Sequence, residues 1–115
     1  MTHKMRELFD NERAVIQQLL VTAKLKPLCT DAQYVDVINE DTGTLRSTHL
    51  AQKQRLKAVS DTSFSDQDGV HVEVILFVDG DGHFGELLVW KVDDTQVIRM
   101  PSSLNEFAPF KPIDR

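Results

Sequence analysis

Aspartate and glycine gather in two short stretches whose residue types could hold a metal ion, DQDG (66–69) and DGDG (79–82). A calcium loop of the EF-hand type needs oxygen ligands at loop positions 1, 3 and 5, glycine at 6 and glutamate at 12. Counted from the first aspartate of DGDG, positions 5 and 12 are His83 and Trp90. Counted from the first aspartate of DQDG, position 5 is Val70. We therefore expect no metal site, and both stretches are predicted to be hairpin turns.

Catalytic chemistry has few candidates. Glu73 and Glu86 could meet as a carboxylate pair on one face of a sheet, with His71 near Trp90, which would make a small hydrolase or a ligand-binding domain. Cys29 and His49 are the candidate nucleophile and base of a catalytic pair. They lie far apart in the sequence, so the signal for such a pair is weak. The sequence contains no zinc-binding cluster, no phosphate-binding loop and no dinucleotide fingerprint. We expect no catalytic residue, no metal and no cofactor.

Composition limits the class of protein. A chain of 115 residues with 41% hydrophobic residues can build one ordinary core, so one domain is expected over 1–115. A single cysteine excludes an internal disulfide, and no stretch approaches the roughly 20 apolar residues of a membrane span. These features favour a soluble protein of the cytoplasm.

Charge is unevenly distributed along the chain. Between Asp61 and Asp94 nine acids face one base, Lys91, so this segment carries −8. Because the whole chain carries −5, the remainder carries +3. No dense basic stripe is present, and we expect no direct binding to nucleic acid. The excess of acids has two explanations. Either aspartate is frequent here because turns favour it, or these acids form a surface that binds a basic partner.

The elements that must position these residues follow from periodicity. Apolar residues recur every three and four positions from Leu8 to Ala23, which predicts an N-terminal helix in the region 1–27 with Asp10 as N-cap and Pro27 beyond its end. Residues 33–100 are predicted to form an antiparallel sheet, in which 44–51 is an edge strand and TQVIRM (95–100) adds a short strand. A proline-rich tail, 101–115, is expected to lay Phe107 and Phe110 on the body. The fold class is therefore α+β, with one helix packed on an antiparallel meander of about five strands.

The strongest hairpin is VHVEVILFV followed by HFGELLVWKV. A two- or four-residue turn would place Val72, Val74 and Leu76 on the same face as Leu87 and Val89, toward the helix. The opposite face would then carry a histidine, two carboxylates and large apolar residues, namely His71, Glu73, Ile75, Phe77, Phe84, Glu86, Leu88 and Trp90. A three-residue turn would exchange the faces of the second strand. Such a mixed face is either covered by the C-terminal tail or serves as a binding surface.

Three motifs resemble those of a family of small uncharacterised bacterial domains. An opening R-x-L-x-x-x-E-R helix is matched by Arg6, Leu8, Glu12 and Arg13. A D-x-D-G-V turn is matched by Asp66, Asp68, Gly69 and Val70. A terminal E-L-D-x-W-K-x-D strand is matched by Glu86, Leu87, Trp90, Lys91 and Asp93, with Leu88 in place of the second acid. Domains of this kind resemble, in size and style, the immunity proteins that bacteria pair with toxins.

The resemblance and the charge together imply a non-catalytic binding protein. We expect an immunity protein that neutralises a cognate bacterial toxin, such as a basic nuclease, through an acidic surface. The residues expected to bind this partner are Asp66, Asp68, Glu73, Asp79, Asp81, Glu86, Trp90 and Asp93. Two alternatives remain, a homodimeric scaffold that buries the Trp90 face and the small hydrolase or ligand-binding domain described above.

Overall fold

A computed structural model describes residues 4–28, 34–48 and 55–113. One helix and seven strands form in this part of the chain, so the helix-on-antiparallel-sheet architecture is confirmed, with seven strands rather than about five. The elements in chain order are β1 (Lys4–Glu7), α1 (Asp10–Thr22), β2 (Tyr34–Asn39), β3 (Thr44–Ser47), β4 (Lys57–Ser65), β5 (His71–Val78), β6 (Phe84–Lys91), the 3-10 helix η1 (Leu104–Glu106) and β7 (Lys111–Pro112).

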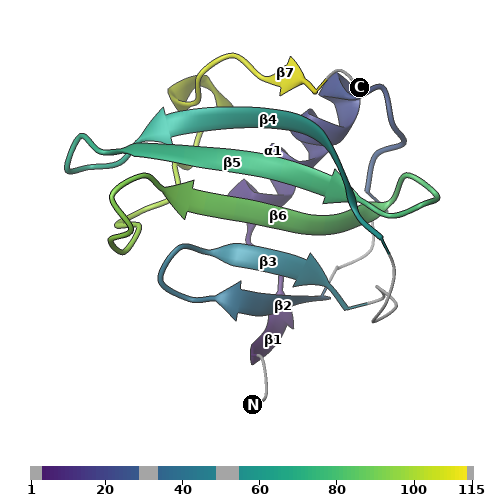
Figure 1. Cartoon of the computed structure of the whole chain (residues 1–115), viewed down its shortest axis with the longest axis horizontal. Helices are drawn as coiled ribbons and strands as arrows, with labels where there is room; N and C mark the ends of the chain where they lie inside the picture. Colours follow the sequence, from purple (N-terminus) through teal and green to yellow (C-terminus); the bar gives the residue numbers. More distant parts are fainter. Residues whose placement is uncertain (1–3, 29–33, 49–54, 114–115) are drawn as a thin grey trace.

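All seven strands belong to one antiparallel sheet, in the order β1-β2-β3-β6-β5-β4-β7. Helix α1 lies behind this sheet in Figure 1, and the face turned toward the viewer carries no helix. The first and last strands of the chain therefore form the two edges. The prediction of an edge strand at 44–51 is wrong, because β3 lies between β2 and β6.

The chain departs from the predicted elements in two places. Arg6 and Leu8 were assigned to the helix region, but residues 4–7 form an edge strand. Helix α1 begins at Asp10 itself, so its N-cap is Phe9, one residue before the predicted cap. The short strand predicted for 95–100 does not form. Its backbone N–H groups are used elsewhere, because Ile98 and Arg99 donate to the Asp66 carboxylate instead of to a neighbouring strand.

The hairpin of β5 and β6 keeps its predicted register by two compensating features. Asp79 N–H bonds to the His83 carbonyl at 2.9 Å, so the turn has three loop residues, with Gly82 at φ +82°. This turn alone would exchange the faces of β6. A bulge at Gly85 shifts the register back, so that Leu76 lies opposite Leu87. Phe84 precedes the bulge and therefore points into the core, which corrects its expected place on the opposite face.

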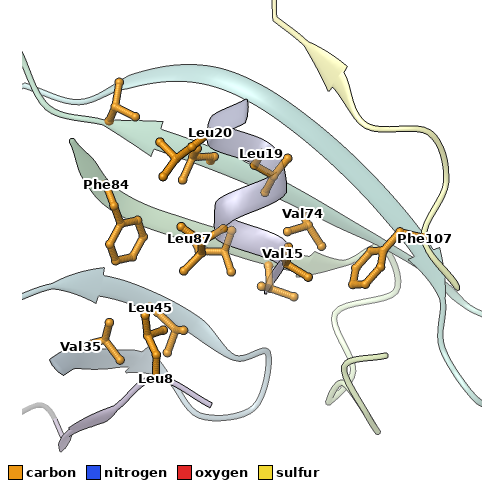
Figure 2. Packing of buried hydrophobic residues seen from close by; sticks show 14 of the residues in the cluster. Leu8, Val15, Leu19, Leu20, Val35, Leu45, Val74, Phe84, Leu87 and Phe107 are labelled. Carbon is orange, nitrogen blue, oxygen red and sulfur yellow. The ribbon is translucent and has the colours of Figure 1, made fainter. Parts of the chain in front are cut away.

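The core lies between α1 and the sheet. The helix contributes its predicted stripe, of which Val15, Ile16, Leu19 and Leu20 are at most 1% exposed. Figure 2 shows Val15, Leu19 and Leu20 of this stripe in one cluster with the sheet residues Val35, Leu45, Val74, Phe84 and Leu87. The tail closes one side of this core, where Phe107 packs edge-on against Phe64 with ring centroids 5.4 Å apart. The tail thus covers the helix side of the sheet, as expected for Phe107, and leaves the other face open.

Candidate functional site

The structure distributes the eight predicted partner-binding residues over three places. Asp66, Asp68 and Asp93 lie at one end of the β5–β6 hairpin, in the turns after β4 and β6, at the left of Figure 1. Asp79 and Asp81 lie in the turn at the opposite end. Glu73, Glu86 and Trp90 lie between them, on the face of the sheet that points away from α1. The acids that are dense in sequence therefore do not form a single patch.

Asp66 is the clearest departure from the expected acidic surface. Its side chain is buried, and its Oδ2 lies 2.9 Å from the Lys91 ammonium. Lys91 is itself 1% exposed, and it also donates to Asp68 Oδ2 at 2.7 Å and to the Gln96 carbonyl at 3.1 Å. An ammonium has three protons, so all three are used. The pair is part of the architecture, and the buried Asp66 does not belong to the acidic surface on which it was expected.

Hydrogen bonding stabilises the charged form of this buried pair. Burial is the largest single influence on Asp66 and would raise its pKa, but four donors oppose it and together hold its pKa below the ordinary value. Those donors are the backbone N–H groups of Ile98, Gln67 and Arg99 and the ammonium of Lys91. Burial likewise would lower the pKa of Lys91, but the two carboxylates raise it above its ordinary value. Both groups therefore stay ionised near neutral pH.

In the sequence Lys91 was identified as the single base of the acidic segment and not as a buried residue, although a signal for its burial was present. It follows Leu87 and Val89 at the spacing of two that points side chains to the same face of a strand. A lysine at such a position points toward the core, so its ammonium must either be buried or turn back to solvent. Buried lysines are rare unless they are paired with an acid. The aspartates of DQDG supply the pairing.

The imagined carboxylate pair does not form. Glu73 lies opposite Trp90 and Glu86 lies opposite Phe77, so the two glutamates share a face but stand four residues apart along the hairpin. At about 3.3 Å per residue this separation is roughly 13 Å, beyond the 5–9.5 Å over which two carboxylates share a glycosidase-type reaction. Glu86 is also bound to Arg46 at 2.8 Å, and Glu73 bonds to His71. Cys29 and His49 lie outside the described residues.

The DGDG turn brings together three groups that could approach a cation. Ligand atoms of Asp79, Asp81 and His83 lie within 4.8 Å of one another. Asp79 Oδ1, however, already accepts the backbone N–H groups of Asp81 at 2.9 Å and His83 at 3.0 Å. The carboxylate thus closes the turn, which agrees with the prediction that DGDG is a hairpin turn.

The uncovered face of the sheet combines acids with exposed aromatic side chains. We call it the open face. The strand pairings place five carboxylates on it against two cations, namely Glu7, Asp36, Asp61, Glu73 and Glu86 against Arg46 and Lys111. Trp90 is 47% exposed and Tyr34 is 49% exposed on the same face. Among the described residues no helix or tail segment covers it.

Beside Trp90 the open face is hollowed. The hollow has a volume of about 400 Å³, and its apolar wall consists of Ile75, Leu88 and the indole ring. Its rim is acidic, because Asp41 from the β2–β3 turn and Asp94 from the turn after β6 line it. Asp94 accepts the indole N–H of Trp90 at 3.1 Å, which fixes the ring. Trp90 was a candidate from the sequence, but Asp41 and Asp94 were not, because only the sheet topology brings these two turns together.

Most residues of the three resembling motifs have an architectural role. Arg6 and Glu12 form a two-pronged ion pair with both N–O distances at 2.8 Å, and Glu12 also accepts the N–H of Phe9 at the start of α1. Asp66 and Lys91 form the buried pair already described. Trp90 differs, because nearly half of its surface is exposed and it contributes little to the core. It is the motif residue most readily assigned to binding.

The fold defines an α+β domain with a single helix on one face of a seven-stranded antiparallel sheet and an acidic, aromatic open face on the other. A family model described as a domain of unknown function, DUF6984, matches residues 5–101. The chain therefore belongs to this family. Comparison with curated proteins found no match, and comparison with solved structures found none. In the described ranges, no helix is long and apolar enough to cross a membrane.

Proposed function

We propose that this protein is a non-catalytic binding protein that neutralises a basic bacterial toxin by docking it on the open face. The observation that carries this proposal is the exposure of Trp90 and Tyr34 on a sheet face that the described chain leaves uncovered. Tryptophan, tyrosine and methionine are enriched at protein interfaces, and the two aromatic side chains supply a large contact area at small entropic cost. Met5, 60% exposed on β1, extends the same face.

The size of the open face supports a protein as the partner. The molecule measures 36 × 34 × 26 Å, and the sheet is spread across its two longer dimensions. A face of that extent offers on the order of 1,000 Å², and a standard interface takes about 800 Å² from each partner. The site is therefore large enough for a folded domain.

The charge of the open face supports a basic partner. Five carboxylates against two cations leave it net negative, and Arg46 is already paired with Glu86. An opposite charge on the partner would steer association and make its rate depend on salt. A toxin that cuts nucleic acid is one class of protein with such a basic surface.

The test is co-expression with the protein encoded next to this chain's gene. We expect the wild type to restore growth and to copurify with that protein. The variant Glu73→Lys reverses one charge on the open face and should slow association, whereas Asp81→Lys makes the same change at an exposed turn tip away from it. Equal loss in both variants would contradict docking on the open face. Unchanged growth and copurification in both variants would likewise contradict docking on the open face, whereas growth inhibition that the wild type does not relieve would contradict the function itself.

A second copy of the chain is the other occupant that the open face could accept. Sedimentation velocity at several protein concentrations distinguishes it from the proposed partner. A stable dimer that dissociates in a Trp90→Ala variant would replace the toxin proposal by the homodimeric scaffold.

A further inference from the structure

We infer that the hollow beside Trp90 receives an arginine side chain from the partner. This inference rests on the proposed function, which it deepens by naming the group that is recognised. An apolar wall with an exposed indole on one side and carboxylates on the rim matches the two parts of arginine, a methylene stem and a planar cation.

The indole ring is held ready for such a ligand. Trp90 Nε1 donates to Asp94 Oδ1 at 3.1 Å, so the ring cannot turn freely about its side-chain bonds. Asp94 has φ of +63°, a conformation that few non-glycine residues adopt, and its N–H bonds to the Lys91 carbonyl at 2.9 Å. Asp93 Oδ1 accepts both the N–H and the hydroxyl of Thr95, which closes the same turn. The aromatic face and the carboxylate are therefore fixed relative to each other before a ligand arrives.

The charges around the hollow select a cation. Asp41 and Asp94 are both exposed on its rim, and Glu73 stands opposite Trp90 on the neighbouring strand. The single basic residue among those lining the hollow is Lys91, whose ammonium is buried and bound to Asp66 and Asp68. No exposed cation lines the described wall, so the carboxylates are not neutralised from within it.

Arginine fits this site better than lysine. A guanidinium is planar, so it can stack on the indole face while its N–H groups bond to a carboxylate at the ring's edge. An ammonium is a compact, strongly hydrated charge that would keep more of its water. Stacking of a cation on tryptophan contributes about 0.5–1 kcal/mol at an exposed site, which corresponds to a two- to fivefold difference in affinity.

The experiment uses the indole N–H signal of Trp90, because the chain has a single tryptophan. Acetyl-arginine amide, acetyl-lysine amide and acetyl-citrulline amide are titrated into the ¹⁵N-labelled protein. Citrulline keeps the shape of arginine but has no charge. We expect saturable shifts of the indole signal with the arginine probe, with a dissociation constant on the order of millimolar. The lysine probe should bind about threefold more weakly, and the citrulline probe should leave the signal in place.

Two matched variants distinguish the effect of the rim carboxylate on binding from the effect of a general loss of negative charge. Asp94→Asn removes one charge, and asparagine tolerates the positive φ and can still accept the indole N–H. Asp81→Asn removes the same charge in the turn at the other end of the hairpin. We expect Asp94→Asn to weaken the arginine probe severalfold and Asp81→Asn to leave it unchanged. Equal binding of arginine and citrulline, or equal effects of the two variants, would overturn the inference.

The same variants distinguish failure of the inference from failure of the proposed function. If the toxin binds wild type and Asp94→Asn equally well, the arginine site is wrong and the docking function stands. If the arginine probe binds as expected but the neighbour-encoded protein is neither bound nor neutralised, the site stands and the proposed partner is wrong. Unchanged folding of both variants, checked by circular dichroism, is the control for either result.

Discussion

Removing the Asp66 carboxylate tests whether the buried pair with Lys91 stabilises the fold. In an Asp66→Ala variant the Lys91 ammonium keeps only Asp68 and the Gln96 carbonyl, and the N–H groups of Ile98 and Arg99 lose their acceptor. Breaking a buried ion pair from one side costs about 3–5 kcal/mol, and a loss of that size is expected here because Lys91 loses its fully buried partner while two backbone N–H groups lose their acceptor. Small domains are stable by about 5–15 kcal/mol, so this change would remove a large share.

The measurement is thermal unfolding by calorimetry at pH 7. A change of 1 kcal/mol moves the melting temperature of a domain of this size by roughly 4 °C, so we expect a fall of about 12–20 °C. The matched control is Asp79→Ala at the same position of the sister turn. Asp79 accepts two backbone N–H groups but no ammonium, and its loss should cost only about 1 kcal/mol. Equal, small effects of the two variants would refute the reasoning.

The pH dependence of stability gives an independent check on Asp66. Its folded pKa lies below its ordinary value, so its stabilising effect is complete above the unfolded pKa of about 3.9. The effect is lost as the pH falls through the folded pKa. The stability difference between the wild type and Asp66→Asn should therefore be constant near neutral pH and shrink below about pH 4. A stability difference between the two proteins that stays the same below about pH 4 would contradict a charged Asp66.

Three further predictions concern single residues. Leu19→Ala empties part of the core at a fully buried position and should cost about 2–5 kcal/mol in urea unfolding; an unchanged midpoint would contradict its role. Burial and the nearby Glu73 raise the pKa of Asp61 despite Lys111, so Asp61→Asn should stabilise the protein above that raised pKa, with the gain vanishing below about pH 3.9. Calcium should not raise the melting temperature; a rise that Asp79→Asn abolishes would reveal a site in the DGDG turn.

The parts of the fold that depend on local periodicity could be predicted from the sequence. The helix stripe through Val15 and Leu19 and the inward residues of β5 follow from spacing alone. The turn at DGDG was also predictable, because Gly82 supplies the positive φ that the turn requires. Its length was not, and the predicted register held only because the bulge at Gly85 offsets the three-residue loop.

The parts that depend on long-range contacts could not be predicted from periodicity. Residues 44–47 are polar enough for an edge strand, but Arg46 is accommodated inside the sheet by its bond to Glu86, 40 residues later. In the sequence Asp66 resembles an exposed acid of a turn, and its burial depends on Lys91, which belongs to another strand. The hollow beside Trp90 likewise combines turns that are distant in sequence, so only its tryptophan was a candidate beforehand.

The position of β3 next to β6 has a consequence for the order in which the chain folds. Strands β4, β5 and β6 are joined by tight turns, and β2 and β3 form a second local hairpin. The two units meet at the pairs Leu45–Leu87 and Arg46–Glu86, and the Thr44 hydroxyl bonds to both the N–H and the carbonyl of Val89. Closing this contact must overcome the loop entropy of a long intervening segment, whereas each hairpin forms between near neighbours. Pairing of β3 with β6 is therefore the step expected to limit the folding rate. The unit formed by β1, β2 and β3 is expected to detach first under partial unfolding.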